Sequence, residues 1–267
     1  MAARLVVALL PAIAAASIIA TSTRPRIAQI RMAGSDARAA QELDAVPVFA
    51  ILLAGSGKLY THEGQCMVYT HLDDATRVLG RMQAAYAEEE LELMPLSLGS
   101  VLTQAGWLKK ATAASSSVEL LLEQQDPQEP IRVNLVASPE ELRAARRIRE
   151  DGGVAKAKRR RGAAGKMQVV PIFHIGAVET AASEDDGGTA GATTPVWPFF
   201  FRRADVDALW QQVGEGQPLP TLRVTDLAAL VDGLRDADAL PDARPMICAP
   251  LDAVEYVRKR AQPPAGL

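Results

Sequence analysis

The chain of 267 residues is long enough to bury a substantial core in one or two domains, which excludes a small fold held together by disulfides. Its 48% apolar and 23% charged residues are ordinary for a globular protein, and a formal net charge of −3 argues against a broad basic surface for nucleic acid. The two cysteines, Cys66 and Cys248, form no CxxC motif, and we expect both to be buried thiols.

Residues 1–40 have the composition of a removable targeting region. The short positive leader MAAR precedes an apolar stretch at 5–20, which is too short for a comfortable membrane span and is typical of a signal-peptide core. Residues 21–40 carry four arginines and no acidic residue before Asp36, as transit peptides do. A signal peptide followed by a transit peptide is the address of plastids of secondary origin. A transit peptide with an apolar front and a bacterial export signal with a loose spacer are the alternatives.

The remainder of the chain contains blocks that occur twice in the same order. VPVFAI at 46–51 returns as VPIFHI at 170–175, and CMVYTHLDDATRVLGRM at 66–82 returns as WPFFFRRADVDALWQQV at 197–213. The second pair predicts a strand that runs into an amphipathic helix in each copy. The proline of VPVF and VPIF predicts the start of a strand, where no N–H is needed for the ladder.

Two further pairs of blocks complete each copy. Residues 91–105 match 219–233, with Leu96, Leu98 and Val101 placed on Leu222, Val224 and Leu227. Residues 131–148 match 243–260, with Pro139 placed on Pro250. Each half therefore has the predicted order ββαβαβα. We predict an α/β fold of two pseudo-symmetric halves from an internal duplication, each a mixed sheet flanked by helices.

The halves span residues 46–150 and 167–261, joined by a basic linker at 151–166 and followed by a tail at 262–267. The acidic, glycine-rich segment 179–194 predicts a flexible hairpin tip. No stretch after the targeting region is long and apolar enough to span a bilayer, so we expect a soluble mature protein, peripheral to membranes.

Capping residues mark two helix starts. Thr70 and Asp73 make a capping box for the first helix. Ser138 can cap a helix that begins at Pro139, where the missing N–H costs nothing, and Glu141 completes that box.

The segment LAGSGKLY at 53–60 superficially matches a phosphate-binding loop. Leu52 stands where that motif requires its first glycine, Leu59 stands where it requires a hydroxyl, and a strand is predicted where the motif needs a helix. We therefore predict a hairpin turn bent by Gly55 and Gly57.

Other polar residues give no catalytic constellation. His62, Cys66 and His71 are close in sequence but are expected on opposite faces, which argues against a zinc site, and nothing nearby lowers the pKa of Cys66. The charge runs at 88–92, 156–161 and 183–186 are predicted to be solvated, with no interleaved aromatic residues for nucleic acid. We expect no catalytic, cofactor-binding or metal-binding residues, and no enzyme.

The unusual feature is apolar. Trp197, Phe199, Phe200 and Phe201 cluster in one run, although aromatic residues make up only 4% of the chain. Such a strand is either buried on both faces or part of an exposed apolar groove, which on a soluble protein marks a binding surface.

These residues resemble the family of the twenty-two-kilodalton component of Tic, the translocon at the inner envelope of chloroplasts. The resemblance rests on the segments VPVF (46–49), PLSL (95–98), VNLVASPEEL (133–142), VPIF (170–173), FFFRRADVDAL (199–209) and LPTLRVTDL (219–227). It covers nearly all of residues 46–260, and its specificity lies in the order and spacing of these segments.

The resemblance implies two similar α/β halves with apolar grooves for extended polypeptide, and an import factor with chaperone-like behaviour in the plastid envelope intermembrane space. It implies precursor polypeptides as partners, with Toc and Tic translocon subunits as further partners, and brings no catalytic residues. Phe49 and Phe173, with Phe199 and Phe201 behind them, are the predicted positions of the groove or of its core. The alternatives are a structural adaptor that docks one translocon subunit and an enzyme using a thiol or phosphate site.

Overall fold

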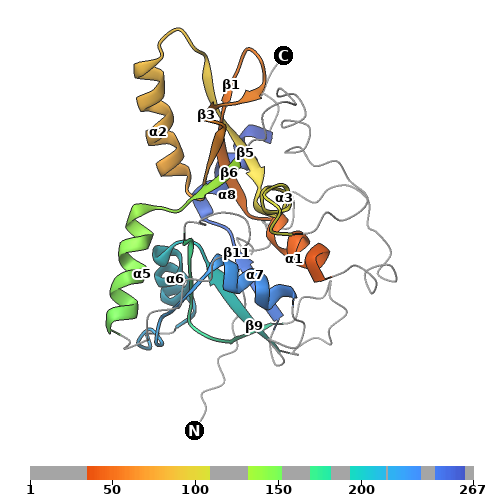
Figure 1. Cartoon of the computed structure of the whole chain (residues 1–267). Coiled ribbons are helices and arrows are strands. Elements are labelled where there is room, and N and C mark those ends of the chain that lie inside the picture. The colour runs from red at the N-terminus through yellow and green to blue at the C-terminus, as the bar shows by residue number, and fades with distance from the viewer. Residues whose placement is uncertain are drawn as a thin grey trace.

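The computed structural model describes residues 35–108, 132–151, 169–181, 193–214, 216–235 and 244–261, which form two mixed β-sheets flanked by helices (Figure 1). The sheet of the first half lies above that of the second in this view. Residues 1–34, most of the basic linker, the hairpin tip at 182–192 and the tail lie outside the described residues.

The first sheet has six strands built around β1. Strand β1 pairs antiparallel with β2, β4 and β5, while β4 pairs antiparallel with β3 and parallel with β6. The strands are β1 (Pro47–Leu53), β2 (Lys58–Leu59), β3 (Thr61–His62), β4 (Gln65–Tyr69), β5 (Leu91–Ser97) and β6 (Arg132–Val136). The helices are α1 (Ser35–Asp44), α2 (Leu72–Ala85), α3 (Leu98–Gln104) and α5 (Pro139–Asp151).

The second sheet has five strands with the same kinds of pairing. Strand β7 pairs antiparallel with β9 and β10, while β9 pairs antiparallel with β8 and parallel with β11. The strands are β7 (Pro171–His174), β8 (Val178–Ala181), β9 (Thr193–Phe200), β10 (Arg223–Asp226) and β11 (Arg244–Cys248). The helices are α6 (Arg203–Val213), α7 (Leu227–Arg235) and α8 (Leu251–Ala261).

The hydrogen bonds correct the predicted alignment of the third and fourth blocks. The N–H of Leu98 donates to the carbonyl of Val46, and the N–H of Leu227 donates to that of Val170, both at 2.9 Å. Leu98 therefore corresponds to Leu227, and its predicted match to Val224 was three residues out of register, because β5 and β10 each run into a helix without a loop.

The fourth block was one residue out of register. The N–H of Leu142 donates to the carbonyl of Ser138, and the N–H of Val254 donates to that of Pro250. Pro250 therefore corresponds to Ser138, whereas Pro139 corresponds to Leu251, the first residue of α8. The predicted alignment was wrong because it matched the two prolines. Pro139 is the first residue of α5, whereas Pro250 is the residue before α8.

Other local predictions had mixed outcomes. Strands β1 and β7 begin at Pro47 and Pro171, as predicted. The glycine-rich segment is a hairpin turn, in which Gly57 adopts a φ of 66° and donates its N–H to the carbonyl of Leu53. The capping box at Thr70 is not formed, because the Thr70 hydroxyl donates to the carbonyl of Val136 at 3.2 Å.

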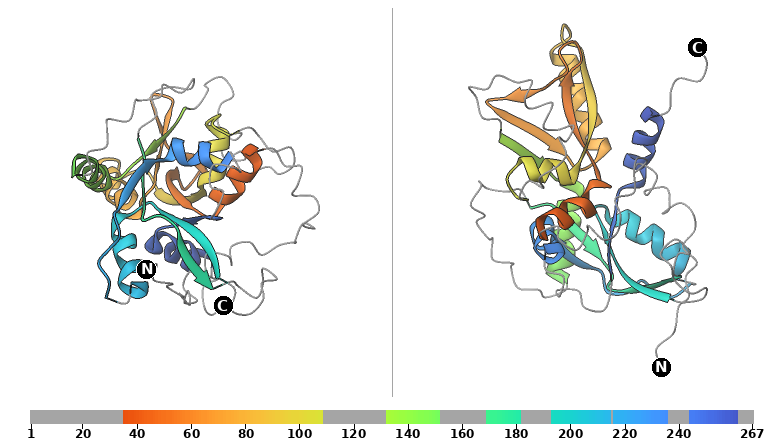
Figure 2. Two further views of the ribbon diagram at one scale, coloured as in Figure 1. Left: turned by 90° about the horizontal axis from the view of Figure 1, so that it is seen from below. Right: turned by 90° about the vertical axis from the view of Figure 1, so that its right-hand side faces the viewer.

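Each half sends its last helix to cover the sheet of the other half. Helix α5 follows β6 of the first sheet but contacts β7 and β10, and α8 follows β11 of the second sheet but contacts β1. Figure 2 shows α8 alongside the first sheet. Helices α1, α3 and α7 lie between the two sheets, where the inner sheet faces form one large apolar core.

Candidate functional site

Each sheet has an outer apolar face centred on one phenylalanine. Phe49 lies opposite Tyr69 and Pro95 in the first sheet, and Phe173 lies opposite Phe200 and Val224 in the second. The first outer face comprises Phe49, Ile51, Tyr69, Leu91 and Leu93, and Ala75 of α2 and Ala253 of α8 complete its apolar cluster. The second outer face comprises Phe173, Ile175 and Phe200, and Ala145 of α5 and Val206 of α6 complete its apolar cluster.

Two helices cover each outer face, one from each half. Over the first face, α2 contributes Ala75 and α8 contributes Ala253, both fully buried, and the ring of Tyr256 meets Phe49 edge-on at 5.7 Å. Over the second face, α6 contributes the fully buried Val206 and α5 contributes Ala145. The apolar positions of these helices follow the helical period, which is why one stripe of each can reach the sheet.

Half-buried apolar side chains surround both faces. Those around the first face are Leu53, Tyr60, Met67, Leu72, Val78, Leu79, Met82, Val136 and Tyr256. Those around the second face are Ala144, Ile148, Val178, Leu209, Trp210, Leu219, Leu222, Val224 and Cys248. Tyr86, which is 46% exposed, extends the first set, because its ring lies 6.4 Å from that of Tyr60. These borders are the accessible apolar surface of the two outer faces.

The four predicted polypeptide-binding residues occupy two environments. Phe49 and Phe173 are fully buried in the first and second outer faces. Phe199 and Phe201 are 5% and 1% exposed and lie in the inner core, whereas Phe200 between them belongs to the second outer face. The run of phenylalanines is therefore a strand buried on both sides. A polypeptide could touch Phe49 or Phe173 only where one of the two helices covering that face had moved away.

The thiols and histidines are not arranged for nucleophilic or metal chemistry. Burial raises the pKa of Cys66 to about 12, so the inert thiol form prevails near neutral pH. Burial likewise raises the pKa of Cys248 to about 12. His62 is exposed whereas Cys66 and His71 are buried, and the described part of the chain contains no group of three or more side chains suited to a metal ion.

A charged junction joins the two halves where the covering helices begin. Arg202, just before α6, pairs with Asp252 in the first turn of α8 at 2.9 Å. Glu141 in the first turn of α5 accepts a hydrogen bond from the N–H of Arg203 at 3.1 Å. Glu141 thus caps α6 instead of completing a box with Ser138, whose hydroxyl accepts the N–H of Glu140 at 3.3 Å. Sequence analysis missed this role, because the α6 cap comes from a residue 62 positions away.

Burial sets the electrostatics of this junction. It raises the pKa of Asp205 to about 6, although the positive charge of Arg202 opposes the shift. Burial also raises the pKa of Glu141 and lowers that of His71, which precedes α2. In each case the low-polarity surroundings disfavour the charged form.

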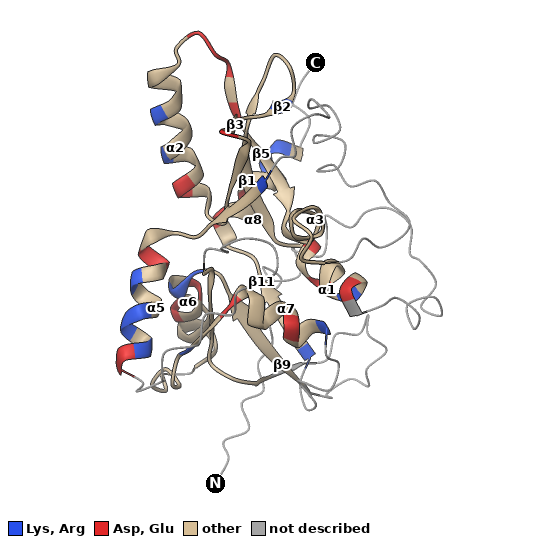
Figure 3. Ribbon diagram, in the orientation of Figure 1, with Lys and Arg blue, Asp and Glu red and all other residues tan. Residues whose placement is uncertain are grey.

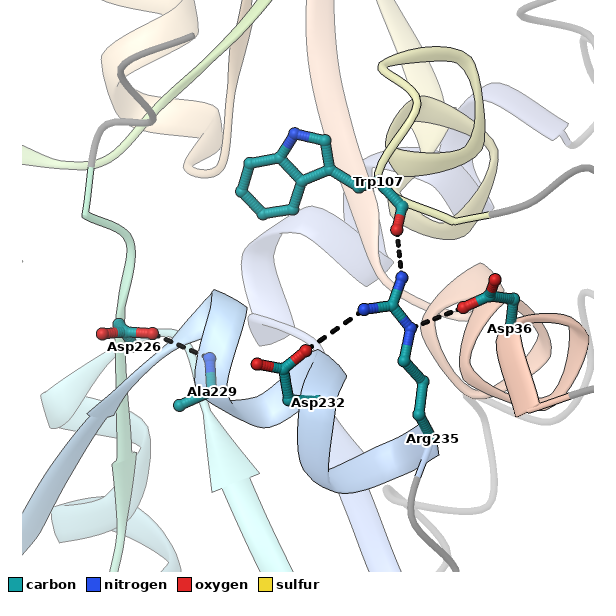
Figure 4. A network of polar contacts seen from close by, with 6 residues as sticks. All are labelled: Asp36, Trp107, Asp226, Ala229, Asp232 and Arg235. Carbon is teal, nitrogen blue, oxygen red and sulfur yellow. Dashed lines mark hydrogen bonds and ion pairs between the residues drawn. The ribbon is translucent and has the colours of Figure 1, made fainter. Parts of the chain in front are cut away.

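Helix α1 is tied into the inner layer by Arg235 at the end of α7 (Figure 4). Its guanidinium donates to Asp36 of α1 at 2.5 Å, to Asp232 at 3.1 Å and to the carbonyl of Trp107. Leu43 of α1 is fully buried. Residues 35–40, assigned from the sequence to the targeting region, therefore belong to a helix that completes the core.

Comparison with solved structures relates this architecture to known proteins. Anabaena Tic22, described as protein transport, matches with a TM-score of 0.55 over 86% of this chain and 99% of its own length, at 16% identity. Tic22 from Plasmodium falciparum matches with a TM-score of 0.54 over 83% of this chain and 96% of its own length, at 15% identity. The chain has a Tic22-like fold. No protein-family model and no curated protein sequence matches it.

The Tic22-like fold spans both halves, because a match over 86% of the chain exceeds the length of either one. At 16% identity the likeness shows the fold alone, so no residue role passes from Tic22 to this chain. The two outer faces and the charged junction are therefore observed in this chain itself and are not inferred from Tic22.

Proposed function

We propose that this chain is a non-enzymatic protein import factor that binds unfolded precursor polypeptides in a chaperone-like manner. The Tic22-like fold carries the proposal, because Anabaena Tic22 is a protein-transport protein. The apolar borders of the outer faces support it, since extended polypeptides of different sequence share exposed apolar side chains. Contacts of this kind give weak and promiscuous binding.

We further propose that the protein acts in the plastid envelope intermembrane space, with Toc and Tic translocon subunits as partners. The composition of the first 34 residues, which precede α1, supports a removable plastid address. Among the described residues, no helix is long and apolar enough to cross a bilayer. Mass spectrometry of the protein from native organelles should place its mature N-terminus before Ser35, because cleavage within α1 would remove part of the core.

An internal duplication is part of the same proposal. Its support is the common pattern of ladders, in which Phe49 and Phe173 each lie opposite an aromatic residue on one side. The paired hydrogen bonds of Leu98 and Leu227 give the same correspondence. Two related halves would provide two related outer faces for one polypeptide.

The test is suppression of client aggregation by the mature protein. We expect it to keep an unrelated, chemically unfolded client in solution, and we expect changing three exposed apolar residues to weaken this effect. The changes are Tyr86→Gln, Leu142→Gln and Leu251→Gln, at side chains that are 46%, 37% and 58% exposed. About threefold more of this variant should be needed for equal suppression, because a few apolar anchors dominate binding.

A matched triple variant controls for the number of substitutions. Glu63→Gln, Arg147→Gln and Glu150→Gln change exposed charged residues and should leave suppression unaltered. Thermal unfolding of both variants verifies that they are folded. Failure of the wild-type protein to suppress aggregation, with tight binding of one translocon subunit, would replace this proposal by the structural adaptor.

A further inference from the structure

Helix α8 binds the first outer face along one stripe of its surface. Ala253 is fully buried, Tyr256 lies against Phe49, and Arg260 follows one turn later. These positions have the spacing i, i+3 and i+7, with which amphipathic helices dock into apolar surfaces. Leu251 is 58% exposed and Glu255 pairs with Lys259 on the solvent side, so α8 is covered by the sheet on one side only.

The last turn of α8 is held by charge. Arg260 pairs with Glu92 of β5 at 2.6 Å and donates to the carbonyl of Leu93 at 2.7 Å. Three further acidic residues at 88–90 come just before β5 in the chain, and Figure 3 shows them in red above the first sheet. The pair of Arg260 with Glu92 thus joins a basic residue at the end of α8 to an acidic residue at the border of the face.

The edge of β5 itself is not available for strand addition. The outward carbonyls of Leu91 and Leu93 accept hydrogen bonds from Gln83 and Arg260, and Pro95 has no N–H to offer. A partner of the first outer face therefore contacts its side chains and does not pair with the backbone edge of β5.

We propose that the first outer face is a binding site for basic amphipathic helices of precursor polypeptides, and that α8 occupies it as an intramolecular competitor. The partner would present a small residue, an aromatic residue and an arginine at the spacing of Ala253, Tyr256 and Arg260. This inference rests on the proposed function and names the class of polypeptide segment recognised.

Competition by α8 has a measurable consequence. A tethered helix lowers the apparent affinity for a free helix by the fraction of molecules in which the face is already occupied. Weakening α8 alone should therefore tighten binding of a free helix. A substitution in the face itself should not tighten binding of a free helix, because the tethered helix α8 and the free helix both lose the same contact.

The experiment measures binding of a fluorescent peptide with the sequence of residues 251–261 to the mature protein. In the protein, Arg260→Ala should tighten binding about fivefold, since it removes an exposed ion pair and a charged hydrogen bond from the tethered helix. Glu92→Ala should give no tightening. Arg258→Ala, an exposed change in the same turn, should leave the affinity unaltered.

Peptide variants test the chemistry of the partner. An unrelated helical peptide with alanine, tyrosine and arginine at the same spacing should compete, and its counterpart with glutamate in place of arginine should not. Thermal unfolding of each protein variant verifies that it is folded.

Equal tightening by Arg260→Ala and Glu92→Ala would overturn the proposal, because it would indicate general loosening. The proposal would also be overturned if the Arg260→Ala protein formed a dimer that the peptide could not dissociate. Such a dimer would mean that a second copy of the chain occupies the face. An extended client without helical segments tests the proposed function separately, so a failure of this inference can be told apart from a failure of the proposed function.

Discussion

The two halves have the same kinds of strand pairing. They differ at the residue just before the helix that follows the paired aromatic strand, which is α2 in the first half and α6 in the second. His71 stands before α2 and Arg202 before α6, each two residues after the aromatic residue opposite a central phenylalanine. Arg202 pairs with Asp252 of the crossing helix α8, whereas His71 is 8% exposed and its Nε2 lacks a well-formed hydrogen bond among the described residues. The same backbone arrangement therefore places a charged side chain, Arg202, before the helix of the second half and a buried imidazole ring, His71, before that of the first.

The covering helices differ in a related way. Helix α5 places Glu141, 8% exposed, against the first N–H of α6, whereas the corresponding residue of α8 is Ala253. Helix α8 instead relies on ion pairs at its two ends, Asp252 with Arg202 and Arg260 with Glu92, which are all partly exposed. Exposed pairs contribute about 0–1 kcal/mol each, whereas breaking a buried one costs more, so α8 should be the more easily displaced cover.

The largest expected effect tests whether the two outer faces are packed alike. Phe49→Ala and Phe173→Ala should each lower the free energy of unfolding by about 3–5 kcal/mol, because both rings are fully buried and each change leaves a cavity. Denaturant unfolding measures both values, with the exposed Tyr86→Ala as a control that should change stability by less than about 0.5 kcal/mol. A cost below about 1 kcal/mol for one phenylalanine would show that its face is loosely covered.

A smaller effect separates the two inner helices. Gly99 of α3 corresponds to Ala228 of α7, and a Cβ at Gly99 would collide with the backbone oxygen of Ala40 in α1. Gly99→Ala should therefore cost about 2–3 kcal/mol, whereas Ala228→Gly should cost only the helix preference of about 1 kcal/mol. Thermal and denaturant unfolding check the pair. Equal losses of stability in the two variants would contradict the close contact between Gly99 of α3 and Ala40 of α1.

The smallest effect is a pH dependence at the junction. Because burial raises the folded-state pKa of Asp205 to about 6 from an ordinary value of 3.8, the folded protein holds this proton more tightly than the unfolded chain. Its contribution to stability is therefore present at pH 4 and lost as the pH rises through 6. Asp205→Asn should stabilise the protein by about 1 kcal/mol more at pH 7.5 than at pH 4, after allowance for solvent screening.

The control for Asp205 is Asp74, which stands at the corresponding position of α2. It pairs with Arg77 at 2.7 Å, whereas Ala208 takes the corresponding place in α6. Asp74→Asn loses that pair and should not stabilise the protein at pH 7.5. A gain at Asp74 equal to that at Asp205 would contradict burial as the cause.

Much of the fold could be predicted from periodicity and from the recurring blocks. The strand starts at Pro47 and Pro171, the hairpin at Gly57 and the helix start at Pro139 follow from local backbone preferences. The register of the third block was missed, since apolar residues at both a strand and a helix period admit several alignments. Helix α1 was missed because its alanines and arginine also suit a transit peptide.

The candidate site was less predictable than the fold. Sequence analysis predicted Phe49 and Phe173 as groove or core positions; the structure buries both beneath helices, and their role in binding polypeptide stays a prediction. It gave no sign that α8 covers the first face or that Glu141 caps α6, because both contacts join segments of different halves.

The sequence by itself determined which segments become strands and helices and which side chains are apolar enough to be buried, because these properties depend on neighbouring residues. Only the tertiary structure decided that the last helix of each half crosses to the opposite sheet, that carboxylates gather where these helices begin, and that α8 lies on an acidic-edged apolar face. The reason is that burial and charge pairing arise between residues far apart in the chain, whose meeting depends on the packing of all the elements together.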